Sequence, residues 1–187
     1  MPSLSMLLAA SIVAFQADNT VLLGLVERDL TGDGTPELLR VVGVGPATGT
    51  LEVTFTIESE GRTLYRYELA PLGRTIGFDA GRRVLSPRER QTRIREFGKW
   101  FFAESKFQRP EEFVEALRDN APGRVAEIPG VIARDRQASE TVPGDVIWDE
   151  IRNAPVTIFT FSPGGDAIVA IGWNERAGRF YRLLECC

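Results

Sequence analysis

The chain has 187 residues, of which 43% are hydrophobic and 26% are charged, so it is long enough to bury the core of a single globular domain. Its net charge of -4 and pI of about 5.1 argue against a nucleic-acid partner, because such partners are bound through a clustered excess of Lys and Arg. The sequence contains no histidine, which excludes catalysis by a histidine base and metal binding through imidazole.

An apolar run occupies residues 2–17 and ends in small side chains. It is too short to cross a membrane comfortably and resembles a secretory signal peptide. We therefore expect residues 1–17 to be removed, leaving one domain over residues 18–187 in the periplasm or outside the cell, with no membrane span. The alternative is that the run forms a buried first strand or helix of an intracellular protein.

Strands are predicted over residues 21–26 and 38–42, and the loop between them has the sequence DLTGDGTPE. Carboxylates stand at its first, fifth and ninth positions, a hydroxyl at its third, and a glycine at its sixth, where calcium loops bend sharply. Calcium binds about six to eight oxygen atoms. We therefore predict a calcium site formed by Asp29, Thr31, Asp33, the carbonyl of Thr35, and Glu37.

This loop has two other interpretations. An EF-hand is excluded because its twelfth position requires a bidentate Glu, and that position is Arg40. The alternative without metal is an Asp- and Gly-rich connection whose side chains accept hydrogen bonds from their own backbone in Asx-turns.

The stretch DLTGDGTPELL resembles the strand-loop-strand calcium motif of FG-GAP and VCBS repeats, found in secreted bacterial proteins and integrin-like propellers. Thr31 stands where that family has Asn or Asp, and Glu37 stands where it has Asp. A propeller needs several copies, and the sequence has one. The resemblance therefore implies a calcium loop and does not imply a propeller.

The middle of the chain predicts a hairpin followed by helices. Alternating apolar residues predict strands over residues 51–58 and 63–69, and a loop is expected over residues 71–83. Ser86, Pro87 and Glu89 form a capping box that predicts a helix from Ser86 to about Ala103. Its buried stripe is expected to contain Ile94, Phe97, Trp100 and Phe101, while its arginines are expected to form a solvated face.

Later segments are predicted from similar patterns. A second helix is expected over residues 110–120, a long connection over 121–143, and one or two helical turns over 144–153. Trp148, Asp149 and Glu150 could line the mouth of a pocket, although ordinary surface packing is the alternative. The last strands are predicted over residues 156–161, 167–173 and 179–185, with residues 167–171 buried on both faces.

The two cysteines, Cys186 and Cys187, are adjacent. They can be free thiols, form a rare vicinal disulfide with each other, or form disulfides with another chain. The order of elements predicts an α+β fold, with antiparallel N- and C-terminal strands sharing a sheet and two to three helices on one face.

Our first hypothesis for function is an exported, non-enzymatic binding or structural domain with one calcium-type loop and a protein or glycan partner. The second is a hydrolase that uses carboxylates such as Asp145, Asp149 and Glu150. The third is an intracellular structural domain without metal.

Overall fold

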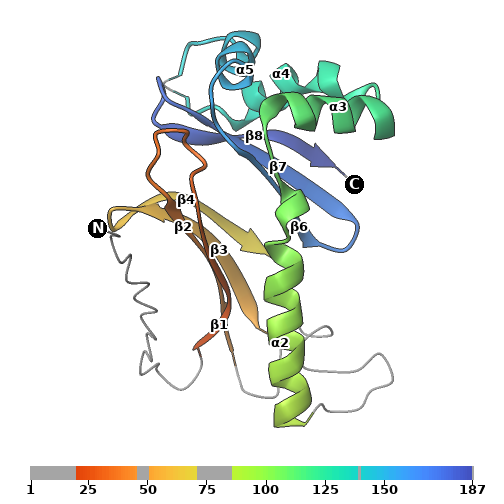
Figure 1. Cartoon of the computed structure of the whole chain (residues 1–187). Helices are drawn as coiled ribbons and strands as arrows, with labels where there is room; N and C mark the ends of the chain where they lie inside the picture. Colours follow the sequence, from red (N-terminus) through yellow and green to blue (C-terminus); the bar gives the residue numbers. More distant parts are fainter. Residues whose placement is uncertain (1–19, 46–50, 71–85, 139, 187) are drawn as a thin grey trace, which may run out of the picture.

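The structure, a computed structural model, describes residues 20–45, 51–70, 86–138 and 140–186. These residues form two antiparallel four-stranded sheets and four α-helices (Figure 1), which confirms the predicted α+β fold. The expected signal peptide and the loop expected over residues 71–83 lie outside the described residues.

The N-terminal sheet is a meander of four strands. Its members, in spatial order, are β1 (Thr20–Arg28), β2 (Glu37–Val44), β3 (Glu52–Ser59) and β4 (Arg62–Leu69). Buried and partly exposed residues alternate along β2 and β3, as the period-two pattern predicts. The strand predictions in this half of the chain are confirmed.

The C-terminal sheet is a separate meander. Its members are β5 (Phe107–Gln108), β6 (Ile158–Gly164), β7 (Ala167–Asn174) and β8 (Arg179–Cys186). As predicted, Val169, Ala170 and Ile171 are all buried. Ile168 is more exposed, because it lies near the hairpin end of the strand. Cys187 lies outside the described residues, so the alternatives for the two cysteines stay predictions.

The expectation that N- and C-terminal strands share one sheet is wrong. Each meander pairs its strands in chain order, and Tyr65 and Tyr67 of β4 pack against Phe180 and Phe161 of the other sheet. The residue that follows β4 also meets the other sheet. There the backbone N–H of Ala70 donates to the carbonyl of Pro163 at 2.6 Å. The two sheets are held together mainly by side-chain packing.

Helix α2 (Pro87–Phe101) crosses the N-terminal sheet and begins at the predicted cap. The Ser86 hydroxyl accepts from the Glu89 N–H at 3.3 Å, and the Glu89 carboxylate accepts from the Ser86 N–H at 2.8 Å. Where the helix meets β1, a Cβ on Gly98 would lie 2.5 Å from the Leu23 carbonyl oxygen. Glycine at this position therefore allows direct contact between the backbones of helix and strand.

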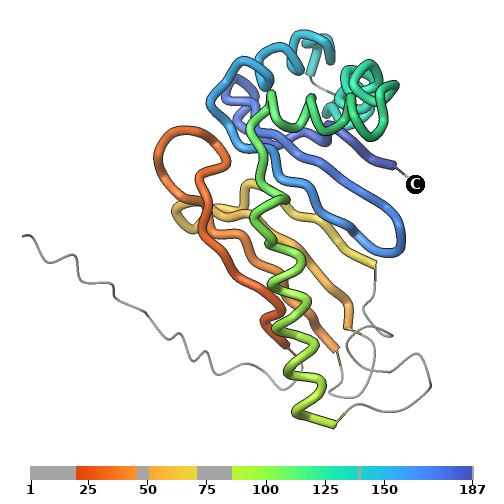
Figure 2. Tube along the Cα trace, turned by 45° about the vertical axis from the view of Figure 1, so that its right-hand side comes forward, coloured from red at the N-terminus to blue at the C-terminus, as the bar shows by residue number. Residues whose placement is uncertain are grey.

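The remaining helices cover the C-terminal sheet (Figure 2), with α4 against β8 and α5 against β7. A short 3-10 turn, η1 (Glu104–Lys106), precedes β5. The three helices are α3 (Pro110–Asn120), α4 (Arg124–Asp135) and α5 (Gly144–Arg152).

The long connection expected over residues 121–143 is wrong for most of its length, and the described helices number four instead of two to three. Three prolines and two glycines favoured a connection over these residues, but one of the prolines, Pro129, lies inside α4. The helix continues through the proline because it buries Ile128, Val131 and Ile132 on one face. Burial of this stripe outweighs the backbone hydrogen bond that proline cannot make.

A cluster of aromatic rings forms the core between the two sheets. Phe55 of β3 packs against Phe101 of α2 and against Phe159 and Phe161 of β6, with ring centroids 5.2 to 5.5 Å apart. Tilted rings at this spacing contribute about 0.5 to 1.5 kcal/mol per pair beyond the area they bury. This cluster is the main connection between the N-terminal sheet, α2 and the C-terminal sheet.

Candidate functional site

The loop predicted to bind calcium folds its aspartates onto its own backbone. The two carboxylate oxygens of Asp29 accept hydrogen bonds from the N–H groups of Gly32 at 2.7 Å and Gly34 at 2.9 Å. Asp33 accepts from the N–H of Thr35 at 2.7 Å. Gly32 and Gly34 have φ values of 77° and 87°, which glycine adopts without strain.

Glu37 is the buried centre of this loop, with 1% of its surface exposed. Its carboxylate accepts hydrogen bonds from the backbone N–H of Leu30 at 2.7 Å and from the Thr31 hydroxyl at 3.0 Å. Leu30 itself is fully buried, and its carbonyl accepts from the N–H of Thr157 at 3.1 Å. The loop therefore links the β1–β2 connection to the segment that leads into β6.

We compared this geometry with the oxygen ligands that calcium requires. Asp29, Asp33 and Glu37 each direct carboxylate oxygens to groups of the loop itself. Across the described ranges, no group of three or more His, Cys, Asp or Glu side chains is placed to hold a metal ion. In this conformation the carboxylate oxygens accept hydrogen bonds from the loop itself, as the Asx-turn alternative predicts. Calcium binding by Asp29, Thr31, Asp33, Thr35 and Glu37 stays a prediction.

The carboxylates named for a hydrolase are occupied by neighbouring groups. Asp149 pairs with Arg152 at 2.8 Å, and Glu150 pairs with Arg176 at 3.0 Å. Asp145 accepts from the N–H of Val146 at 2.9 Å. Trp148 is 5% exposed and packs in the core instead of lining a pocket mouth.

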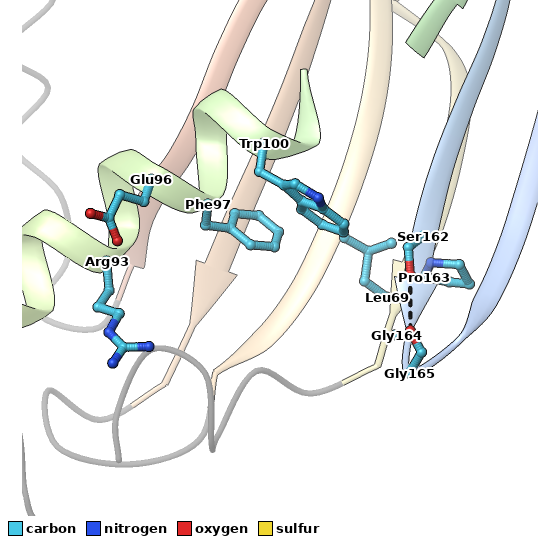
Figure 3. A pocket seen from close by; sticks show the side chains of 9 residues that line it. All are labelled: Leu69, Arg93, Glu96, Phe97, Trp100, Ser162, Pro163, Gly164 and Gly165. Carbon is cyan, nitrogen blue, oxygen red and sulfur yellow. Dashed lines mark hydrogen bonds between the residues drawn. The ribbon is translucent and has the colours of Figure 1, made fainter. Parts of the chain in front are cut away.

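A groove that the sequence did not reveal lies between α2 and the β6–β7 turn, with a volume of about 380 Å³ (Figure 3). One wall is formed by side chains of α2 and the other by Leu69 and the turn. We call it the Trp100 groove. The residues that line it are Leu69, Arg93, Glu96, Phe97, Trp100, Ser162, Pro163, Gly164 and Gly165.

Trp100 is the most unusual residue of this groove, because 50% of its surface is exposed. The expectation that it widens the buried stripe of α2 is therefore wrong. Phe101 next to it is buried in the aromatic cluster, and a rotation of about 100° per residue places Trp100 at the edge of that stripe. Its indole packs against Phe97 at 6.0 Å between ring centroids, and the Lys106 ammonium lies 5.3 Å from its centre.

The charged end of the groove lies toward the start of α2. Figure 3 shows the Arg93 and Glu96 side chains at one end, with Phe97 and Trp100 projecting toward Leu69 and Pro163. Neither Arg93 nor Glu96 has an ion pair within the described part of the chain. The groove thus combines an apolar floor with charged groups at one end.

A second polar region joins α4 to β8 and is already internally paired. Asp135 pairs with Arg182 at 2.6 Å, while Glu140 accepts from Arg179 at 3.1 Å and from the Tyr181 hydroxyl at 2.9 Å. Burial, and then the hydrogen bond to Glu140, raise the pKa of Tyr181 to about 12. No sequence pattern indicates this network, since its members come from distant segments. Its groups stabilise the fold by satisfying one another.

Comparisons with protein families, with curated proteins and with solved structures found no match to this chain. No helix within the described ranges is long and apolar enough to cross a membrane.

Proposed function

We propose that the protein is an exported, non-enzymatic binding domain and that the Trp100 groove is its ligand site. The observation that carries this proposal is a half-exposed tryptophan beside Phe97 and Leu69 at a concave surface. The other two tryptophans, Trp148 and Trp173, are buried in the core.

The composition of the groove supports binding of a small ligand or a short segment of a larger partner. Covering an exposed indole with an apolar group lowers the free energy of the complex, because apolar area is then removed from water. Binding sites combine such apolar surface with a few polar groups that fix orientation, and volumes of about 300 Å³ or more are typical. Arg93, Glu96 and the backbone of the β6–β7 turn provide these polar groups.

A non-enzymatic role is favoured over hydrolysis by the positions of the acids. Glycosidases need two carboxyl groups facing each other about 5 to 9.5 Å apart across the substrate. Among the described residues that line the groove, Glu96 is the only one with a carboxylate. Of the carboxylates named from the sequence, Asp149 and Glu150 are held in ion pairs elsewhere, and Asp145 accepts from the neighbouring Val146 N–H.

The test uses the indole N–H signals of the three tryptophans in a two-dimensional NMR spectrum, with Trp100→Phe to assign the signal of Trp100. The protein is titrated with a panel of oligosaccharides, short peptides and small aromatic acids. We expect at least one class to shift the Trp100 signal and leave those of Trp148 and Trp173 unchanged. If no member of the panel moves the Trp100 signal, the groove is not a ligand site.

Export and calcium are further parts of this proposal. The apolar run at residues 2–17 supports export to the periplasm or beyond. The resemblance of the loop to FG-GAP and VCBS motifs supports a calcium ion that stabilises the connection between the sheets. Both parts are tested by the measurements described below.

A further inference from the structure

We propose that the Trp100 groove binds the free C-terminus of a partner polypeptide, with the last apolar side chain against Trp100 and Phe97 and the terminal carboxylate on Arg93. This inference rests on the proposed function, since it names the ligand of the same groove. The observation behind it is the order of side chains along the groove, in which Arg93 lies at one end and Phe97 and Trp100 follow. The C-terminus of a polypeptide presents a carboxylate and an apolar side chain in the same order.

Arg93 provides the positive charge for an anionic group at its end of the groove, where the Glu96 carboxylate is an opposing charge. Helix α2 carries five basic side chains and two acidic ones, in a chain whose net charge is -4. Arg93 has no ion pair within the described residues, and Arg90, one turn earlier, has two buried guanidinium nitrogens without a hydrogen-bond partner there. A guanidinium pairs best with a planar anion such as a carboxylate, which it can bind through two parallel hydrogen bonds.

The opposite wall favours a polypeptide over a fatty-acid chain that bears the same carboxylate. This wall is formed by Leu69 and by the turn residues Ser162, Pro163, Gly164 and Gly165, and the two glycines have no side chain. A Cβ built on Gly165 would meet nothing within 4 Å, so the backbone there is open. The carbonyls of Pro163 and Gly165 already accept from the Ala70 N–H at 2.6 Å and from the Ser162 hydroxyl at 3.4 Å. Each carbonyl oxygen has a second lone pair that can accept from the N–H of a bound peptide, whereas an acyl chain offers no donor.

The size of the groove limits the ligand to a short terminal segment. A volume of about 380 Å³ lies at the small end of the range for ligand sites. This volume suits one or two residues, and a whole helix or long strand would not fit. Since the end of a chain is the only place where a main-chain carboxylate occurs, the charged end of the groove selects for it.

The experiment measures fluorescence polarisation of a labelled pentapeptide of glycine and serine that ends in leucine, with a free carboxylate. Two matched probes are the same peptide with an amidated C-terminus and a peptide ending in serine. We expect amidation and the leucine-to-serine change each to weaken binding to the wild type at least tenfold. Sodium decanoate, titrated as a competitor, tests whether the groove instead binds a fatty acid, which also combines a carboxylate with an apolar chain.

Three variants identify the groups responsible. Arg93→Gln should weaken the carboxylate peptide at least tenfold and leave the amidated peptide unchanged, while Trp100→Ala should weaken both. Arg95→Gln, an exposed arginine of the same helix that does not line the groove, should stay within twofold of the wild type. Circular dichroism of each variant establishes that it is folded.

Several results would overturn the inference. Equal binding of the amidated peptide, or equal losses in Arg93→Gln and Arg95→Gln, would show that the carboxylate is not recognised. Displacement by decanoate at lower concentration than by the unlabelled peptide would assign the groove to an acyl ligand. If no peptide binds but another compound shifts the Trp100 indole signal in the NMR titration, this inference fails and the proposed binding function stands. If no compound shifts that signal, both proposals fail.

Discussion

Replacement of Glu37 tests what organises the loop between β1 and β2. Glu37→Ala removes a buried carboxylate that accepts from the Leu30 N–H at 2.7 Å and from the Thr31 hydroxyl at 3.0 Å. Hydrogen bonds to a charged group contribute about 1.5 to 3 kcal/mol each, and a buried N–H left without an acceptor costs about 1 to 3 kcal/mol. Since these terms overlap, we expect the free energy of unfolding to fall by about 3 to 5 kcal/mol.

Glu37→Gln is the matched variant. Its side-chain oxygen can still accept from the Leu30 N–H, and its amide can donate to the Thr31 hydroxyl, so the loss should be about 1 kcal/mol. Glu52→Ala, an exposed glutamate of β3, should change stability by less than about 0.5 kcal/mol. Urea unfolding followed by circular dichroism measures all three. A loss below 1 kcal/mol for Glu37→Ala would refute the role of this carboxylate in holding the loop.

The same proteins test calcium when thermal unfolding is measured in calcium, in magnesium and in chelator. If the loop binds calcium, wild type gains about 2.7 kcal/mol at a calcium concentration one hundred times the Kd. Asp33→Ala and Glu37→Gln should then lose most of this gain, because each removes a charged ligand. A wild-type melting temperature that is equal in all three conditions would leave the loop as a self-capped turn.

Further predictions concern the rest of the fold and export. Ser86→Ala should cost about 1 kcal/mol through loss of the helix cap, and Phe101→Ala should cost about 3 to 5 kcal/mol because the ring is buried, both measured by urea unfolding. Gly98→Ala should destabilise by about 1 to 3 kcal/mol through collision with the Leu23 carbonyl. Gly130→Ala in α4, where an added Cβ would only touch the end of the Arg134 side chain at 3.8 Å, should stabilise by up to about 1 kcal/mol. Equal effects of the two changes would refute the close contact at Gly98. Burial raises the pKa of Tyr65, Tyr67 and Tyr181, so the folded protein keeps these phenol protons at a pH near 10, where the unfolded chain loses them. The free energy of unfolding should therefore fall as the pH rises from about 10 to 12. Titration of these tyrosines in the native protein at the ordinary pKa, followed by tyrosinate absorbance, would contradict this prediction. Intact mass of protein recovered from the periplasm or medium should lack the first 14 to 17 residues, and retention of the full chain would contradict export.

Local patterns predicted the elements of this fold better than their arrangement. The capping box at Ser86 and the alternation in β3 each depend on a few neighbouring residues, and both are confirmed. Helix α4 was missed because Pro129 dominated the local signal, although tertiary burial of its apolar face outweighs that signal. The division into two sheets was missed because hydropathy does not determine which strands pair.

The candidate sites show the same limit. The loop from Asp29 to Glu37 was found because its chemistry lies within nine consecutive residues. The Trp100 groove combines residues of β4, α2 and the β6–β7 turn, so no window of sequence contains it. The exposure of Trp100 could have been inferred from its offset from the Ile94, Phe97 and Phe101 stripe, but the wall facing it could not.

The aromatic cluster has a consequence for the order in which the chain can fold. Phe55 finds one partner in α2, but Phe159 and Phe161 belong to β6 and are synthesised much later. Until β6 is in place, Phe55 lacks its contacts with Phe159 and Phe161, and an incomplete chain exposes apolar rings that favour aggregation. Holding the chain unfolded until both sheets can form would avoid this intermediate, and the export proposed above would delay folding in this way.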